Sequence, residues 1–296
     1  MFNNFKHILF FLLFSLSVVY SQNPVVEHMS KISNLPDVEF YDILEDDDHY
    51  IWLAADKGLY RYNGKNYKKF TNPNQKVNSL FQLKLDETGR LWCINLYGQI
   101  FYIENNTLTL FYDANKLVKG QLSPFEITDK AIRLFTVDGI YDINFEDKSV
   151  VKLFEGMSVS ESSYNKLSYV IKMDSDDRPS KEKQNWYQIK DDKLKLLIEL
   201  TSKHRMQSPK VYAFKNSALL NFKEQGKNQF YYYNTQADKV KKLTTPKNLE
   251  DVTIYNIISL NNDYWFLTTS GVFIFQLKQN QLIFKEQLFS NESVTD

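Results

Sequence analysis

Short runs of apolar residues alternate with polar turns along most of the chain. In the first clear stretch these runs cover residues 41–44, 50–54, 59–62 and 66–70, and each is too short for an ordinary helix. The turn Asn63-Gly64 separates the last two runs, and Asn-Gly between alternating apolar residues is a strong signal for a β-hairpin. The pattern therefore predicts four consecutive short strands joined by tight turns.

This four-strand pattern repeats at intervals of 40 residues in the first third of the chain. An acidic residue, a tryptophan and a glycine recur with that interval. They are Asp46 and Asp86, Trp52 and Trp92, and Gly58 and Gly98. The tryptophan–glycine spacing returns at Trp265 and Gly271, and a weaker copy surrounds Gly139. Four-stranded units of this length are typical of a β-propeller.

The intervals between the glycines predict how many units the chain contains. Gly139 and Gly271 are 132 residues apart, or three steps of 44, so two further units fit between them. Segments 169–189 and 211–233 carry strand-like alternation in the right places. We therefore predict an all-β propeller with six four-stranded repeat units. Residues 291–296 resemble the opening of the first unit, which predicts the start of a seventh unit and an incomplete seven-bladed ring.

The N-terminus has the pattern of a secretory signal peptide. Lys6 and His7 precede an almost unbroken apolar run over residues 8–20, and compact residues precede Gln22. About 13 apolar residues are too few to cross a bilayer, which needs about 20. We expect residues 1–21 to be a signal peptide. Residues 22–296 then form the propeller of a longer receptor, with residues 24–29 as the outer strand of its last blade.

Composition narrows the possible functions. The 36 Lys and Arg residues balance the 36 Asp and Glu residues, so no basic excess predicts binding to nucleic acid or to an anionic membrane. The 22 Phe and 19 Tyr residues favour strands. Cys93 is the only cysteine, so no intrachain disulfide forms. Because Cys93 lies in an apolar stretch, we expect a buried and inert thiol.

One motif resembles a known repeat. The pattern Asp-x-x-Gly-x-Leu-Trp at residues 86–92, followed six residues later by Gly98, resembles the two-component regulator propeller repeat. The first unit resembles it as well, although His49 stands in place of the usual turn glycine. The resemblance is specific over residues 35–112 and 252–288 and weak between them. It implies the periplasmic sensor region of hybrid two-component or histidine kinase receptors of Bacteroidetes type.

The resemblance implies a larger architecture around the propeller. Members of this family have seven-bladed periplasmic propellers, followed by an immunoglobulin-like domain, a transmembrane helix and a cytoplasmic module that is commonly a histidine kinase. Several members sense oligosaccharides. The chain would then be exported to the periplasm and tethered to the inner membrane only through a C-terminal part of the full-length protein. A homodimer of the full receptor is an open alternative.

No residue pattern points to catalysis, and no cofactor is expected. A nucleophile elbow, a phosphate loop and a zinc-protease motif do not occur in the sequence. The acidic run at residues 45–48 lacks the spacing and glycine of a calcium loop, so we interpret it as an exposed turn and expect no metal site. A pair of carboxylates for glycoside cleavage, contributed by different blades, stays an open alternative.

The recurring residues have a structural explanation. A tryptophan at one position of every clear unit predicts packing between blades, and a glycine after it predicts a turn with positive φ. These structural repeat positions are Trp52, Trp92, Trp265, Gly58, Gly98, Gly139 and Gly271. Trp186 lies outside this frame beside Tyr187, and the pair is the weak candidate for ligand contact because aromatic faces stack on sugars.

Two classes of function follow from the sequence. The primary hypothesis is a sensor ectodomain that binds an oligosaccharide or another extracellular small ligand and belongs to a signal transduction receptor. The alternatives are an exported propeller enzyme that acts on glycans, as a lyase or hydrolase, and a protein-binding scaffold. Sensing is preferred because both the repeat resemblance and the signal peptide support it.

Overall fold

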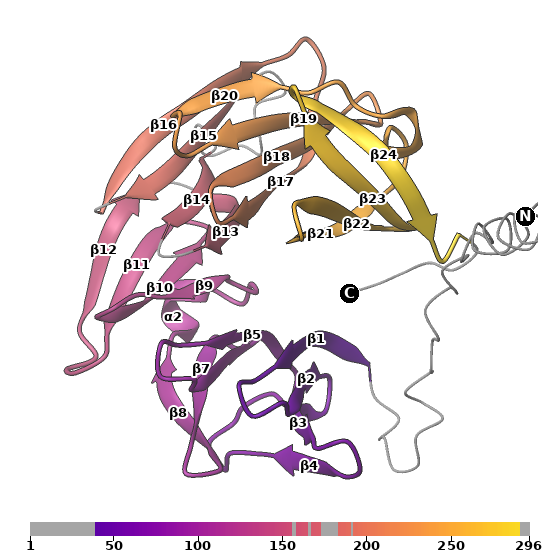
Figure 1. The fold of residues 1–296 in the computed structure, drawn as a ribbon. Helices are drawn as coiled ribbons and strands as arrows, with labels where there is room; N and C mark the ends of the chain where they lie inside the picture. Colours follow the sequence, from indigo (N-terminus) through magenta and orange to yellow (C-terminus); the bar gives the residue numbers. More distant parts are fainter. Residues whose placement is uncertain (1–38, 156–157, 165–166, 173–182, 191, 291–296) are drawn as a thin grey trace, which may run out of the picture. The chain divides into compact units, whose positions relative to one another are not determined.

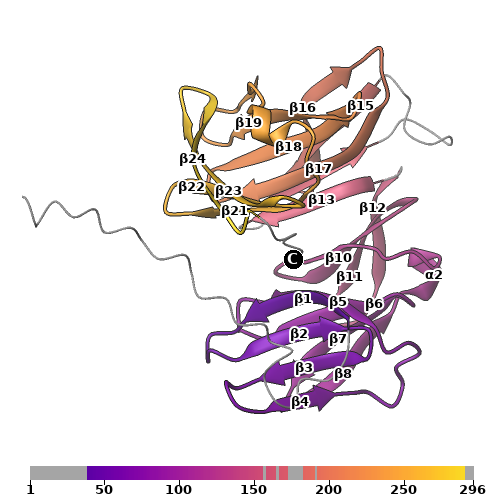
Figure 2. The ribbon, with the colours of Figure 1, turned by 90° about the vertical axis from the view of Figure 1, so that its right-hand side faces the viewer.

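The computed structural model describes residues 39–155, 158–164, 167–172, 183–190 and 192–290. Within these residues the chain forms six sheets of four strands each (Figure 1). The strands of each sheet follow one another in sequence order and pair antiparallel, as Figure 2 shows for β1 to β4 of blade one. The prediction of a propeller with six four-stranded units is therefore confirmed.

The strands of the first three blades have the following bounds: β1 (Phe40–Glu45), β2 (Ile51–Ala55), β3 (Gly58–Tyr62) and β4 (Tyr67–Phe70); β5 (Leu80–Leu85), β6 (Leu91–Asn95), β7 (Gln99–Glu104) and β8 (Thr107–Asp113); β9 (Phe125–Ile127), β10 (Ala131–Thr136), β11 (Gly139–Asn144) and β12 (Val150–Glu155). A short helix, α2 (Asn115–Val118), lies between blades two and three.

The strands of the last three blades have these bounds: β13 (Ser158–Tyr164), β14 (Leu167–Lys172), β15 (Lys183–Lys190) and β16 (Lys193–Thr201); β17 (Met206–Phe214), β18 (Ser217–Glu224), β19 (Lys227–Asn234) and β20 (Lys239–Lys242); β21 (Ile254–Leu260), β22 (Asp263–Thr268), β23 (Gly271–Lys278) and β24 (Gln281–Leu288). A turn of 3₁₀ helix, η2 (Lys247–Leu249), precedes blade six.

The hydrophobic core lies between consecutive blades, and β6 of blade two shows this because it is buried on both faces. In β6, Leu91 and Cys93 pack in an apolar layer with blade one, whereas Trp92 and Ile94 pack in a layer with blade three. Successive side chains of a strand point to opposite faces, so an unbroken apolar run serves two layers. Each fully buried aliphatic or aromatic side chain contributes about 1.5–3 kcal/mol, which is how a chain without a disulfide holds this fold.

The acidic residue of the repeat closes the first turn of its blade. Asp86 Oδ1 accepts hydrogen bonds from the backbone N–H groups of Thr88 (2.9 Å) and Arg90 (3.0 Å), and Asp86 Oδ2 accepts one from Trp92 Nε1 (2.8 Å). Asp46 makes the same set of bonds in blade one, including one from Trp52 Nε1 at 2.6 Å. The motif therefore couples turn formation to the orientation of the tryptophan.

The tryptophans differ in what covers them. Trp52 and Trp92 are buried between their own blade and the next one, as predicted. Trp265 is only half-buried. Its neighbours Tyr264 and Phe266 pack toward blade five, so Trp265 lies on the opposite face of blade six, and no blade follows there within the described part of the chain.

The glycine prediction needs a correction at one position. Gly58, Gly98 and Gly271 adopt φ values of 131°, 92° and 102°, as a turn glycine would, but Gly139 does not have positive φ. Gly139 is explained by steric crowding instead, because a Cβ at this position would lie 2.5 Å from the carbonyl oxygen of Phe154.

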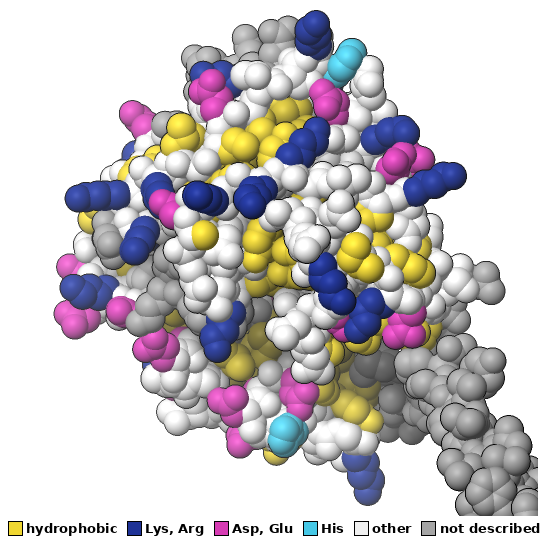
Figure 3. Space-filling view, turned by 45° about the horizontal axis from the view of Figure 1, so that its top comes forward, with side chains coloured by type: hydrophobic (Ala, Val, Ile, Leu, Met, Phe, Trp, Pro, Cys, Tyr) yellow, Lys and Arg dark blue, Asp and Glu magenta, His cyan; other side chains and the backbone are white. Residues whose placement is uncertain are grey.

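Several predictions fall outside the described residues. The signal peptide (1–21), the outer strand at 24–29 and the seventh unit at 291–296 all do so. Among the described residues, no helix is long and apolar enough to cross a lipid bilayer. Figure 3 shows a face on which basic and acidic side chains are interspersed with exposed apolar ones.

Candidate functional site

Blade three departs from the repeat at the tryptophan position. The last residue of the second strand pairs with the repeat glycine, which is Gly58 in blade one and Gly139 in blade three. Trp52 lies three residues before that strand end in blade one, and Arg133 lies three residues before it in blade three. A guanidinium group therefore stands where blades one and two bury an indole. Arg133 is only 6% exposed. A buried charge is costly unless it is paired, so its surroundings are informative.

Arg133 joins blades three and four. Its Nε and Nη2 atoms donate to the two carboxylate oxygens of Asp142 on β11, at 2.8 and 2.9 Å. Nη2 also donates to Oδ1 of Asp192, which lies in the turn before β16 of blade four, at 2.5 Å. A bidentate arginine–carboxylate pair is among the strongest hydrogen-bonded arrangements in proteins.

A buried acid lies on the other side of Arg133. Glu126 on β9 and Asp142 on β11 are both register partners of Arg133, so the three side chains form one rung across the sheet. Glu126 is 5% exposed and accepts a hydrogen bond from the hydroxyl of Ser168 in blade four. Burial by itself would lower the pKa of Arg133, but the bonds and charges of Asp142 and Asp192 raise it above its ordinary value.

A hollow of about 360 Å³ opens beside this rung between blades three and four. Its size lies within the range of small-molecule sites. The charged side chains that line it come from the rung, from the β9–β10 turn and from blade four. They are Glu126, Asp129, Lys130, Arg133, Asp142 and Asp192. Thr128 and Ser168 also line it, and their hydroxyl groups donate hydrogen bonds within the protein, to the carbonyl oxygen of Ala131 and to Glu126.

A larger hollow, of about 710 Å³, lies on the other side of the β9–β10 turn, between blades two and three. Thr128 and Asp129 line both hollows, so the turn separates them. Asp86 and Arg90 line this second hollow from blade two, and the Arg90 guanidinium lies 5.1 Å from the ring centre of Tyr102. The two hollows therefore adjoin each other along blades two to four.

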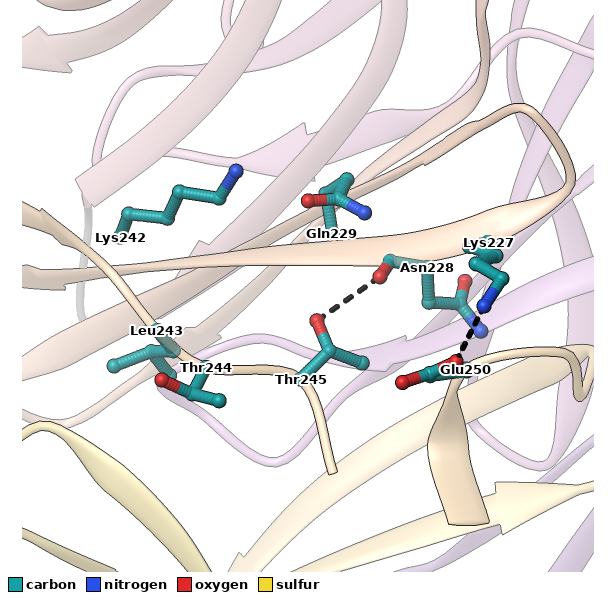
Figure 4. A pocket seen from close by; sticks show the side chains of 8 residues that line it. All are labelled: Lys227, Asn228, Gln229, Lys242, Leu243, Thr244, Thr245 and Glu250. Atoms are coloured by element: carbon teal, nitrogen blue, oxygen red, sulfur yellow. Dashed lines mark hydrogen bonds and ion pairs between the residues drawn. The ribbon is translucent and has the colours of Figure 1, made fainter. Parts of the chain in front are cut away.

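A third hollow, of about 440 Å³, has a structural explanation (Figure 4). It lies where β20 stops short and the connection to blade six crosses β19. Asn228 Nδ2 donates to the carbonyl oxygens of Leu249 (2.7 Å) and Val252 (2.9 Å), and Thr245 Oγ1 donates to the carbonyl of Asn228 (3.0 Å). These hydrogen bonds satisfy the backbone carbonyl groups at the edge of the sheet. We therefore interpret this hollow as a feature of the fold and not as a ligand site.

The sequence candidates Trp186 and Tyr187 line none of these three hollows. Trp186 on β15 is 1% exposed and packs in the layer between blades four and five, near Phe222. Tyr187 points to the other face, against the layer that Phe135 and Ile140 of blade three help to form. The indole of Trp186 is therefore enclosed in the core, where it contacts neighbouring side chains.

The residues of the rung were not among the sequence candidates. The available signal was the glycine frame, because counting back from Gly139 as from Gly58 places Arg133 at a position that holds tryptophan in clear units. The remaining charges come from separate strands and blades, and spacing along the chain does not reveal them. The described residues contain no group of three or more His, Cys, Asp or Glu side chains placed to hold a metal ion.

Comparisons with known proteins give likenesses of fold. No protein-family model matches the sequence. No curated protein matches it either. Among solved structures, the extracellular domain of the hybrid two-component system BT4673 from B. thetaiotaomicron is 14% identical, with a TM-score of 0.65 over 91% of this chain. That of the hybrid two-component system BT3049 from the same organism is 12% identical, with a TM-score of 0.59 over 88% of this chain.

A propeller enzyme is similar to the same degree. A streptogramin B lyase structure is 14% identical, with a TM-score of 0.61, and the match covers 88% of this chain and 86% of the lyase. By contrast, this chain spans 39% and 36% of the two extracellular domains. At such low identity the likenesses establish the propeller fold and leave function to the residues of the site.

Proposed function

We propose that this chain is the periplasmic ligand-sensing propeller of a two-component signal transduction receptor. The observation that carries the proposal is the hollow between blades three and four, where charged side chains from both blades meet at a size suited to a small ligand. The fold likeness to extracellular domains of two hybrid two-component systems supports the receptor setting.

The geometry of the rung suits sensing. Arg133 belongs to blade three and Asp192 to blade four, so a ligand that contacts both affects the pairing between the blades. A ligand shifts a conformational equilibrium by its difference in affinity for the two states. An inter-blade site therefore gives a bound ligand a direct effect on the arrangement of the ring.

The proposal includes the rest of the receptor. The exported propeller lies in the periplasm and is tethered to the inner membrane through a C-terminal part of the full-length protein, whose effector is a histidine kinase. The chain itself has no catalytic role, its partner is an oligosaccharide or another extracellular small ligand, and it does not bind nucleic acid.

We also propose that the ring contains a seventh blade. Asp42 on β1 accepts the backbone N–H of Ile43 (2.8 Å) through Oδ1 and reaches Leu83 N of the next blade (2.6 Å) through Oδ2. Asn256 holds the same register position in blade six and accepts the N–H of Ile257 in the same way. By analogy with Asp42, we propose that the other amide atom of Asn256, the donor Nδ2, faces the position of a following blade.

An exported propeller enzyme that acts on glycans is the second candidate. The similarity to a streptogramin B lyase favours it, and Glu126 and Asp142 supply two carboxyl groups on one rung. Asp142 is paired with Arg133, and Glu126 accepts a hydrogen bond from Ser168, so both carboxyl groups are engaged in a way that favours binding over proton transfer.

Calorimetry distinguishes the two candidates. The protein is titrated with a panel of oligosaccharides and other small extracellular compounds, and each mixture is then analysed for products. We expect binding without turnover, and weaker binding in the Asp142→Asn variant. Cleavage of a glycan that is lost in Glu126→Gln or Asp142→Asn would overturn the sensing proposal.

A further inference from the structure

Charge is distributed unevenly over the chain, although its total is balanced. Residues 206–249, which form blade five and the connection that follows it, contain eight Lys residues. The same segment contains two acids, Glu224 and Asp238, and no Arg. Blade five therefore has a surplus of six positive charges within a chain whose basic and acidic residues are equal in number.

The two acids of blade five are already engaged. Asp238 pairs with Lys195 of blade four, and Glu224 accepts a hydrogen bond from a serine hydroxyl that follows β16. Glu250, the first acid after the segment, pairs with Lys227 at 2.7 Å. The surplus therefore belongs to other lysines, and their place in the fold decides whether they form one surface.

Four unpaired lysines lie together at the outer edge of blades five and six. Three of them lie on β20, the outermost strand of blade five, and their side chains are exposed. A bridge between Thr244 and Gln281 places the end of β20 beside the β23–β24 turn, which carries a fourth exposed lysine. None of the four forms an ion pair within the described part of the chain. We call this set the lysine edge: Lys239, Lys241, Lys242 and Lys278.

Protection of the sheet edge does not account for this density of lysine. A lysine on an outermost strand discourages pairing with another sheet. However, β8 has none, β12 and β24 have one each, and β4 and β16 have two each. The lysines of β12 and β24 pair with acids, as Lys152 does with Glu155 and Lys285 with Asp263. The three unpaired lysines among the four residues of β20 therefore exceed what edge protection uses elsewhere in this protein.

The surroundings of the lysine edge favour a lipid surface over a polymer chain. Lys241 and Lys242 point to opposite faces of β20, so they spread across a broad surface and do not line one groove. Tyr231 and Tyr232 are their register partners, and Phe284 on the outermost strand of blade six is 48% exposed. Aromatic rings accompany lysine where proteins meet the headgroups of a bilayer, whereas a polyanionic chain requires charge alone.

We propose that the lysine edge docks the propeller against a bilayer surface that contains anionic phospholipids. The ammonium groups donate to the phosphate oxygens of the headgroups, and each lysine near such a surface adds to the attraction. The inference goes beyond the proposed function, because it concerns a second surface, on blades five and six, and not the ligand hollow between blades three and four. A membrane tether and this contact together would fix the orientation of the ring.

Co-sedimentation with vesicles tests the proposal. The protein is mixed with vesicles of phosphatidylcholine alone, or of phosphatidylcholine and phosphatidylglycerol in equal amounts. We expect binding to the anionic vesicles that weakens as salt is added, because salt screens exposed charges. The apolar N-terminal run is common to all variants, so differences among them report on the lysine edge.

Two triple variants locate the contact. The first combines Lys239→Gln, Lys241→Gln and Lys242→Gln, and we expect its partition coefficient on anionic vesicles to fall at least about tenfold. The matched control combines Lys65→Gln, Lys68→Gln and Lys69→Gln, which remove the same number of exposed charges at β4, the outermost strand of blade one. Binding of this control should be nearly unchanged. Equal melting temperatures of the variants and the wild type verify that both fold.

Three results would overturn the proposal. The first is binding that does not distinguish anionic from neutral vesicles, and the second is an equal loss of binding in the two triple variants. The third is equal or tighter binding of soluble polygalacturonate that the β20 variant loses, which would assign the lysine edge to an acidic glycan. Ligand sensing is measured separately by calorimetry, so it stands or fails independently of these results.

Discussion

His49 and Gly89 occupy the same position in the first turns of blades one and two. Both have positive φ, at 63° and 77°. Glycine adopts this conformation without steric cost, whereas a residue with a Cβ is strained there. His49 makes a hydrogen bond with Glu45, but both side chains are exposed, and such pairs contribute little.

We therefore expect His49→Gly to stabilise the protein. Relief of backbone strain should raise Tm by about 2 °C for a domain of this size. The reverse change, Gly89→Ala, should lower Tm by a similar amount, since its Cβ meets only ordinary contacts. Thermal unfolding followed by circular dichroism measures both. A lower Tm in His49→Gly would show that the turn is held by the His49 side chain.

Asp86 makes stability depend on pH. Burial by itself would raise the pKa of Asp86, but hydrogen bonds from Thr88, Trp92 and Arg90 outweigh it and hold the pKa below its ordinary value. A carboxyl group whose pKa is lower in the folded state stabilises the protein above its unfolded pKa. That contribution is lost as the pH falls through the folded pKa.

The Asp86→Asn variant tests this role. An amide places a donor opposite Trp92 Nε1, so we expect a loss of about 1–2 kcal/mol in the free energy of unfolding at neutral pH. The difference from wild type should shrink at low pH, where Asp86 itself is protonated. Urea unfolding at several pH values measures it, with Asp48→Asn of the exposed turn in blade one as control. A difference that stays constant with pH would contradict the assignment.

Single residues differ in how far the sequence predicts their role. Trp52 and Trp92 were correctly predicted to pack between blades, because a repeat position reports on a repeated environment. Trp186 is also enclosed in the core, although it lies outside the repeat frame. Arg133 was not predicted as a site residue. A charged residue in a strand of a degenerate unit is normally interpreted as exposed, and its burial becomes clear only from its partners elsewhere in the fold.

At the scale of elements, blades are joined by side chains from their first strands. The register of β5 shifts between Phe81 and Lys84, and Gln82 in this bulge accepts the backbone N–H of Phe125 in blade three (3.2 Å). Alternation of apolar and polar residues predicts strands but not bulges, because an extra residue looks like a break in the pattern. The strand boundaries that the sequence predicts in blade one lie within one residue of those of β1 to β4, whereas the inter-blade bonds were not predicted.

The rung of Glu126, Arg133 and Asp142 yields a prediction at this scale. Arg133→Ala leaves the part-buried Asp142 without the guanidinium that donates two hydrogen bonds to it, beside the buried Glu126, so we expect a loss of about 3–5 kcal/mol in the free energy of unfolding. Lys285→Ala removes an ion pair with Asp263 that is more exposed and should cost less than about 1 kcal/mol. Chemical denaturation compares them. A loss below about 1 kcal/mol in Arg133→Ala would mean that the rung is not a structural unit.

At the scale of the whole molecule, every described blade but the last has a following blade on the corresponding face. Blade six presents Trp265 and Asn256 there, at positions that blades one and two use for contact with the next blade. Ile258 and Leu260 on β21 are 46% and 50% exposed. An exposed apolar face on an edge blade favours association with another surface. The seventh-blade proposal therefore has this face covered by the next blade of a closed ring in the full-length protein.

A polar substitution on this face decides whether the ring closes over it. If a blade covers β21 in the full-length protein, Ile258→Asp buries an unpaired charge and should lower the free energy of unfolding by more than about 2 kcal/mol. Leu196→Asp on β16 is the matched control, because Leu196 is exposed to a similar extent, at 50% against 46%, and lies on the outermost strand of blade four. That change should stay within about 0.5 kcal/mol, as exposed substitutions do. Equal small effects of the two changes would place Ile258 in solvent and contradict a seventh blade, whereas a selective loss in Ile258→Asp would mean that the apolar layers continue around the ring.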